Sequence, residues 1–290
     1  MPNDNKIRAN FFMLVSSLDP NIFFDQFKRM RLRDFLIIPF ILMAATPVLA
    51  ATSEWTQTPG GKVRVILDET STSGELRGAL QIDLNPGWKT YWRNPGDAGV
   101  PPQLNLEGDV SARIDFPAPV SFGTGDEGGI GYKHPVSLPL TFSVKPGQEQ
   151  LKGNAFLGVC QNICIPVQAE FDFPLTLKAA EQSPQTIAAS TIVETAFDRL
   201  PSPATQDFGV KAAKREENKA IFAVSVPDNQ LPAELFVGSE QFNLSETTPD
   251  TASDERRFIA TLQGKASQGA MIDYTLVQNG NAVSGQVRLD

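Results

Sequence analysis

The fold is decided at residues 158–167, Gly158-Val159-Cys160-Gln161-Asn162-Ile163-Cys164-Ile165-Pro166-Val167, which hold both cysteines of the 290-residue chain. In an extended strand, two residues four positions apart lie about 13 Å from each other. A disulfide requires Cα atoms within about 7 Å. If Cys160 and Cys164 are bonded, the chain must therefore curl between them.

The residues around the pair favour strands over a helix. Pro166 moves the backbone of the preceding residue towards β or polyproline geometry. Phe156-Leu157 on one side, and Ile165 with Val167 on the other, are the apolar and β-branched residues typical of strands. We therefore expect two strand ends joined by a tight turn, with the sulfur atoms at its tip.

Three roles are open for the cysteine pair. A bridge from Cys160 to Cys164 closes a loop of about five residues and stabilises by about 2 kcal/mol, whereas a bridge across an immunoglobulin-type sandwich gives about 4 kcal/mol. A short bridge suits thiol exchange better than stabilisation, so a redox-active pair is the first hypothesis and a structural bridge the second. Metal ligation is the third, because two thiolates can bind Cu(I), although a closed zinc site needs four ligands. Otherwise we expect no metal site and no cofactor.

The first fifty residues have the features of a secretory signal peptide. Basic residues at 29–33 precede an apolar run from Phe35 to Ala45, and small residues follow up to Ala50. The apolar run falls short of the roughly twenty residues that span a bilayer, and no later stretch approaches that length. We expect residues 1–50 to be removed, with an uncleaved anchor as the alternative and Met30 as a second possible start.

The charge of the chain agrees with export. Residues 1–50 carry six basic and four acidic side chains, a net +2, and the whole chain carries −8, which leaves −10 for residues 51–290. Such an acidic surface disfavours nucleic acid and anionic membranes as partners. We expect a periplasmic protein, in an oxidising compartment where a cysteine pair stays oxidised unless a partner reduces it.

Short apolar runs separated by many of the 22 glycines and 22 prolines predict an all-β protein. Several short strands with regular turns predict a β-sandwich at residues 52–178. Its strand candidates are apolar runs or alternating patterns between turns: 62–67, 76–84, 99–106, 112–116, 136–144 and 169–177.

An aromatic cluster follows the turn at Asn85-Pro86-Gly87. Trp88, Tyr91 and Trp92 lie within five residues, and they are either core aromatics of the sandwich or a wall around the cysteine turn. His134 is the only histidine, and we expect it to be an ordinary surface or strand residue.

Residues 122–132 are predicted to form a mobile, glycine-rich loop. The loop does not match a P-loop or a dinucleotide-binding fingerprint, because no Lys-Ser/Thr follows it and no helix opens after it. Asp126-Glu127 within it is expected to be solvated. Close to the cysteines, this acidic pair would raise the pKa of the thiols and slow their chemistry.

An ordered set of motifs carries a resemblance: Gly87-Trp88-Lys89-Thr90-Tyr91-Trp92-Arg93-Asn94-Pro95-Gly96-Asp97-Ala98-Gly99, then Phe116-Pro117-Ala118-Pro119, Gly131-Tyr132 and Cys160…Cys164-Ile165-Pro166. Together they resemble the N-terminal periplasmic domain of the thiol:disulfide interchange protein DsbD and its relative ScsB, over residues 55–178. The resemblance implies an immunoglobulin-like sandwich. Such a domain passes electrons from a membrane-embedded partner domain to periplasmic thiol proteins through one cysteine pair.

The resemblance also implies roles for individual residues. Cys160 and Cys164 are the implied catalytic pair, and Cys164 is the cysteine that joins a substrate in a mixed disulfide. The best-known members of the family space their cysteines further apart than this chain does. The family's cap loop falls on residues 123–131, which include Asp126 and Glu127. This chain has mostly glycine where the family has a shielding aromatic, and the residues that could substitute are Phe122, Ile130 and Tyr132.

Partners are implied in the same way. Thioredoxin-like periplasmic proteins are the implied substrates. Because this sequence does not continue into a transmembrane segment and a thioredoxin-like domain, as DsbD and ScsB do, we expect a membrane electron donor to act in trans. The link between ScsB and copper tolerance is the reason to retain Cu(I) handling as an alternative.

The rest of the chain is predicted to be a linker and a second domain. Residues 179–206 form the linker, with a short packed helix that starts at Ser183-Pro184 and ends before Pro201. Residues 207–290 contain no cysteine or histidine and are predicted to form a second small immunoglobulin-like β-sandwich, as a spacer or docking surface. Its strand candidates are 208–213, 220–226, 234–237, 257–262, 272–278 and 283–289, with Asn279-Gly280 as a hairpin turn.

These observations predict a periplasmic dithiol carrier. Reduced Cys164 would attack the disulfide of a partner, and Cys160 would resolve the mixed disulfide. Whether such a relay acts as an enzyme, a protein-disulfide reductase, is left open. The alternative is a non-enzymatic periplasmic binding module in which the same bond is structural.

Overall fold

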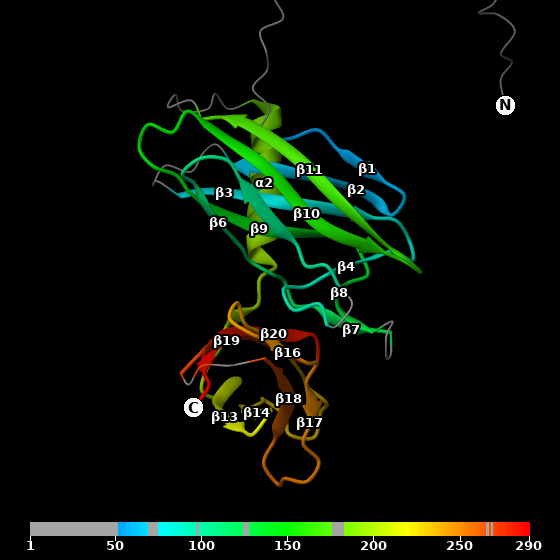
Figure 1. Cartoon of the computed structure of the whole chain (residues 1–290), viewed down its shortest axis with the longest axis vertical. Helices are drawn as coiled ribbons and strands as arrows, with labels where there is room; N and C mark the ends of the chain where they lie inside the picture. The colour runs from blue at the N-terminus through cyan, green and yellow to red at the C-terminus, as the bar shows by residue number, and fades with distance from the viewer. Residues whose placement is uncertain are drawn as a thin grey trace, which may run out of the picture. The chain divides into compact units, whose positions relative to one another are not determined.

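The computed structural model describes residues 52–68, 75–96, 99–123, 128–175, 183–264, 267 and 269–290. These residues all lie in one compact unit, Leu49–Asp290. The expected signal peptide, residues 1–50, lies outside the described residues. In the part of the chain that the structure describes, strands in four sheets accompany a single short helix, which confirms the all-β prediction (Figure 1).

The first sheet of the first sandwich is antiparallel, with the strand order β1-β2-β3-β9-β6. Alternating burial in its strands explains its stability, because Val63, Val65 and Leu67 point into the core. The strands are β1 (Thr56–Thr58), β2 (Gly61–Asp68), β3 (Glu75–Leu84), β6 (Ser111–Ile114) and β9 (Val136–Ser143).

The second sheet has the strand order β11-β10-β4-β8-β7, with β5 paired to β10 beside β4. Its two longest strands form one hairpin that pairs from Gln150↔Pro174 to Cys160↔Cys164. The strands are β4 (Lys89–Tyr91), β5 (Gln103–Leu106), β7 (Val120–Phe122), β8 (Gly129–Tyr132), β10 (Gln150–Cys160) and β11 (Cys164–Pro174).

The glycine-rich stretch differs from its prediction. The sequence indicated a loop over residues 122–132, whereas Gly129–Tyr132 form strand β8 between β4 and β7. Glycine is required here by close packing: a Cβ at Gly131 would lie 2.0 Å from the carbonyl oxygen of Thr90. The glycines that predicted a loop instead allow the backbones of β8 and β4 to approach closely.

The helix α2 (Pro184–Asp198) begins as its sequence predicts. The side chain of Ser183 caps it by accepting from the Thr186 amide, and Pro184 occupies the first turn. Its apolar face packs on Ile66 and Ala79, on the outer side of β2 and β3. The helix therefore adds a layer to the first sandwich, where the sequence indicated only a packed segment between domains. The helix residues that make this contact are Ala189, Val193 and Ala196.

The second sandwich also has two sheets, with the strand orders β12-β20-β19-β15 and β13-β14-β18-β16, and β17 paired to β18. Its six predicted strands all occur, within a few residues of the expected bounds. The predicted turn at Asn279-Gly280 is confirmed, because Gln278 pairs with Asn281 across it. The strands are β12 (Ser202–Pro203), β13 (Gly209–Glu216), β14 (Lys219–Ser225), β15 (Glu234–Gly238), β16 (Asn243–Leu244), β17 (Thr248–Pro249), β18 (Arg257–Gln263), β19 (Met271–Gln278) and β20 (Asn281–Arg288).

Candidate functional site

The two cysteines lie at the tip of the β10–β11 hairpin. Cys160 is the last residue of β10 and Cys164 the first of β11, and the two are directly opposite each other with Cα atoms 4.1 Å apart. A disulfide joins them. Between them the Gln161 amide donates to the carbonyl oxygen of Ile163 at 3.2 Å. The predicted geometry, two strand ends with the sulfurs at a tight turn, is therefore confirmed.

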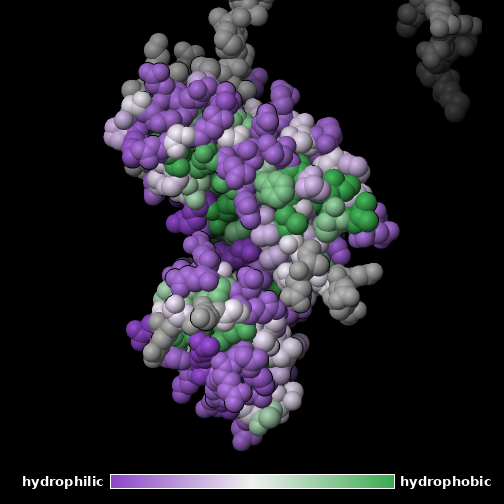
Figure 2. Space-filling model, in the orientation of Figure 1, coloured by the Kyte–Doolittle hydropathy of each residue, from purple (hydrophilic) through white to green (hydrophobic). Residues whose placement is uncertain are grey.

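The two ends of this disulfide differ in access to solvent. Cys160 is 1% exposed, whereas Cys164 is exposed. The neighbouring Ile163 is 70% exposed, the most of any large apolar side chain in the described residues. In the space-filling view, hydrophobic residues gather over the tip of the β10–β11 hairpin, on a face that is otherwise mostly hydrophilic (Figure 2). Of the two cysteines, Cys164 is therefore the one that faces solvent, while Cys160 is buried.

Strand β4 brings the hydroxyl group of Tyr91 close to the sulfur of Cys164. It pairs with the end of β10, and the Thr90 hydroxyl donates to the buried carbonyl oxygen of Gly158 at 2.9 Å. The next residue, Tyr91, brings its phenol oxygen to 3.3 Å from Sγ of Cys164. Burial raises the pKa of Tyr91 above its ordinary value, so the phenol stays protonated at neutral pH. Tyr91 can therefore donate a hydrogen bond to a thiolate at Cys164.

Phe122 lies beside the buried cysteine. Its ring lies 5.9 Å from the ring of Tyr91, and these two residues form a small buried cluster with Cys160, separate from the main core. Nζ of Lys89 lies 4.6 Å from the centre of the Phe122 ring, on the same side of β4. An aromatic side chain from the end of β7 therefore lies beside the buried cysteine.

The other aromatic residues named from the sequence lie elsewhere. Trp88 is half-buried and packs against the main core of the first sandwich. Trp92 is 1% exposed, and its ring contacts Phe116 and Phe236 at 6.3 Å each, so it lies where the two sandwiches meet. Only Tyr91, of the three residues considered for an aromatic wall, has a described contact with Cys164.

The remaining residues named from the sequence lie in the core, on the surface or outside the described residues. Ile130 is in the main core, as is Tyr132, whose hydroxyl donates to the carbonyl oxygen of Pro117 at 2.8 Å. His134 is exposed. Asp126 and Glu127 lie outside the described residues.

Among the residues with a described position, no group of three or more His, Cys, Asp or Glu side chains could hold a metal ion. Within the same ranges, no helix has the length and apolar character needed to cross a membrane.

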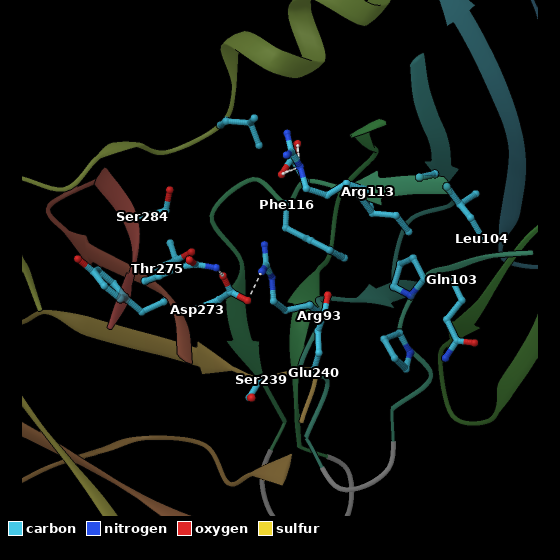
Figure 3. Close-up of a pocket in the computed structure, with 18 of the residues that line it drawn as sticks. Arg93, Gln103, Leu104, Arg113, Phe116, Ser239, Glu240, Asp273, Thr275 and Ser284 are labelled. Carbon is cyan, nitrogen blue, oxygen red and sulfur yellow. Dashed lines mark hydrogen bonds and ion pairs between the residues drawn. The ribbon is translucent and has the colours of Figure 1, made fainter. Parts of the chain in front are cut away.

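A groove of about 970 Å³ lies away from the disulfide. Residues of both sandwiches line it, including Arg93 and Phe116 from the first and Asp273 and Ser284 from the second (Figure 3). The cysteines do not belong to its lining, so the disulfide does not open into this groove.

The first sandwich is similar to a known protein family. Residues 62–176 match the family model described as thiol:disulfide interchange protein DsbD, N-terminal. This match contains both cysteines, Tyr91 and Phe122, and it confirms the resemblance seen in the sequence motifs. No curated protein matches the chain.

One solved structure supports the fold of both sandwiches. The crystal structure of the N-terminal periplasmic domain of ScsB from Proteus mirabilis aligns with a TM-score of 0.67 and 20% identity, covering 83% of this chain and 98% of that one. The human desmocollin-1 ectodomain aligns with a TM-score of 0.20 and 8% identity, covering 82% of this chain and 51% of that one, a likeness too low to indicate a common fold.

Proposed function

We propose, from the match of residues 62–176 to the DsbD N-terminal family, that this protein relays electrons to partner thiol proteins through Cys160 and Cys164. One observation carries the proposal: an exposed Cys164 bonded to a buried Cys160 at a hairpin tip. A structural bridge gains nothing from this asymmetry. A relay uses this difference in exposure, because one sulfur must bond to the partner while the other stays protected until it resolves the mixed disulfide.

The exchange balances in two steps. In the reduced protein, the Cys164 thiolate attacks one sulfur of the partner's disulfide, a mixed disulfide forms, and the partner's other sulfur leaves as a thiolate. The Cys160 thiolate then attacks Sγ of Cys164 and releases the partner's remaining sulfur as a thiolate. Two electrons have moved to the partner, whose disulfide is now a dithiol, and Cys160–Cys164 is again a disulfide.

Tyr91 supports the first step in this proposal. Its phenol is a protonated donor 3.3 Å from Sγ of Cys164, and a hydrogen bond to a thiolate favours the charged form. The thiolate is the nucleophile in exchange. Tyr91 therefore increases the fraction of Cys164 that can attack at neutral pH.

The proposed setting is the periplasm. The ScsB domain that shares this fold is periplasmic by its own description. We place the substrates among thioredoxin-like proteins of that compartment, and the source of electrons in a membrane-embedded protein. Both partners follow from the family resemblance.

A trapping experiment tests the relay. The Cys160→Ala variant keeps the attacking sulfur and lacks the resolving one, so it should accumulate a mixed disulfide with a periplasmic thioredoxin-like protein that dithiothreitol releases. The matched control is Cys164→Ala, which should form no adduct because its remaining sulfur is covered. Equal adduct yields from both variants, or none from either, would contradict the proposed roles.

The reduction potential separates the relay from a structural bridge. Structural disulfides of secreted proteins have potentials below about −300 mV. We expect the Cys160–Cys164 bond to be more oxidising than this in equilibrium with glutathione or dithiothreitol. A value below that limit would favour the binding-module alternative.

A further inference from the structure

The segment Thr90–Asn94 connects the disulfide to the second sandwich within five residues. At its start, Thr90 and Tyr91 contact the β10–β11 hairpin, through the Gly158 carbonyl oxygen and Sγ of Cys164. The three residues that follow, Trp92, Arg93 and Asn94, all contact the second sandwich. No gap in sequence separates the residue beside the sulfur from those that meet the neighbouring domain.

Each of the three makes a different kind of contact. The Asn94 amide donates both protons, to the carbonyl oxygens of Val237 in β15 and Leu244 in β16, at 2.8 and 3.0 Å. A single side chain that holds two strands at once fixes both distance and orientation. The sequence indicated only a spacer or docking surface for residues 207–290. These residues bind the first sandwich three positions after Tyr91, at Asn94.

Arg93 and Trp92 add an ion pair and a ring contact to the two hydrogen bonds of Asn94. The Arg93 guanidinium reaches across the groove to the carboxylate of Asp273 at 3.0 Å, with both side chains about two-thirds buried or more (Figure 3). The Trp92 ring packs against Phe236, which belongs to the main core of the first sandwich although it lies in β15. The two cores are therefore continuous at this point.

The aromatic cover is attached to the same segment. The Ile130 amide of β8 donates to the carbonyl oxygen of Pro95 at 3.1 Å, and the Trp92 amide donates to that of Ile130 at 3.0 Å. Strand β8 pairs with β7, which ends in Phe122. Movement of residues 92–95 would therefore move both Tyr91 and Phe122.

We propose that the second sandwich holds the disulfide site in shape, and that Arg93 and Asn94 are positioning residues that transmit this support. Through them, strand β4 and the β7–β8 pair are fixed so that Tyr91 meets Cys164 and Phe122 covers Cys160. The inference rests on the proposed function only in taking Cys164 as the reacting sulfur.

The test measures reduction of the disulfide in the full chain by dithiothreitol under native conditions. Asn94→Ala removes the two donors to β15 and β16, and Asp273→Asn removes the charge opposite Arg93 from within the second sandwich. Each variant should be reduced about fivefold faster than the parent protein, because loss of a hydrogen-bonded anchor lowers the cost of local opening. If Asn94→Ala fails to fold, the isosteric Asp273→Asn carries the test alone.

A matched control lies within the second sandwich. Arg256 donates to the carbonyl oxygens of Asn229 and Leu231, both in its own domain. Arg256→Ala should keep the parental reduction rate, even where its denaturation midpoint falls as far as that of the interface variants. A second readout is the 13Cζ resonance of Tyr91, which should move in Asn94→Ala and Asp273→Asn and stay in place in Arg256→Ala.

Two results would overturn the inference. Parental rates in both interface variants would show that the second sandwich leaves the site unaffected. Equal acceleration in Arg256→Ala would show that global unfolding, not local support, sets the rate. Because no partner protein is present, failure to trap a mixed disulfide in the earlier experiment would leave this result unchanged.

Discussion

The β10–β11 hairpin of the first sandwich and the β19–β20 hairpin of the second are both regular antiparallel pairs closed by a short turn. In β19–β20, Asn279 and Gly280 take left-handed conformations, with φ of 50° and 77°, and the turn ends in solvent. In β10–β11, the turn ends in a disulfide that lies against Tyr91 and Phe122. The strands placed beside its tip therefore distinguish the disulfide hairpin from an ordinary one.

Loss of one cysteine should remove thiol exchange, a reaction that only the β10–β11 turn can carry out. Cys164→Ser should abolish thiol exchange with any partner, because the accessible sulfur is lost, and should lower the free energy of unfolding by only about 2 kcal/mol. Exchange is followed by gel mobility of mixed disulfides and stability by guanidinium unfolding. A variant that kept exchange through Cys160 would show that the buried sulfur is reachable after all.

The next effect tests the hydroxyl beside the sulfur. Tyr91→Phe keeps the ring and removes the donor to Cys164, so the thiolate fraction at neutral pH should fall and alkylation of the reduced protein by iodoacetamide should slow by about tenfold. The slowing should shrink as the pH rises and the thiol ionises fully in both proteins, whereas burial keeps Tyr91 itself protonated at neutral pH. Tyr274→Phe, a buried tyrosine of the second sandwich, is the control and should leave the rate unchanged.

The aromatic cover should have a smaller effect in the opposite direction. Phe122→Leu keeps an apolar side chain over Cys160 and loses the ring contact with Tyr91, so dithiothreitol should reduce the disulfide about threefold faster. Phe171→Leu, in the main core of the same sandwich, is the matched variant and should affect stability without this acceleration. If the two variants behaved alike, Phe122 would be one more core residue.

A change in the β19–β20 turn should lower stability slightly and leave the cysteines unaffected. Gly280 has a φ of 77° with open space around it, so Gly280→Ala should lower stability through backbone conformation alone, by about 1 kcal/mol. Reduction and alkylation rates at the cysteines should stay as in the parent protein. A change in those rates would show that the two hairpins are coupled more closely than the contacts of residues 92–94 explain.

Much of the fold is predictable where local pattern and tertiary environment agree. The strands of the second sandwich follow from apolar alternation, its last hairpin from Asn279-Gly280, and the helix start from Ser183-Pro184. The cysteine turn follows from spacing and from Pro166. In each case a short stretch determines its own backbone conformation.

The rest depends on which elements become neighbours. Trp88, Tyr91 and Trp92 look alike in sequence, and the register of β4 against β10 decides that Tyr91 meets the sulfur while Trp92 meets Phe236. Strand β8 reads as a loop because glycine gives no hydrophobic pattern. Contacts of Asn94 with residues more than 140 positions away leave no trace in local sequence.

The packing of α2 has a practical consequence for anyone who truncates this protein. Ile66 and Ala79 face outwards from the first sandwich and are fully buried because the helix covers them. An expressed fragment cut at residue 178, the end of the first domain predicted from the sequence, would leave an apolar stripe open to solvent and prone to self-association. A fragment that runs to Asp198 retains helix α2 over these residues and should stay monomeric at higher concentration.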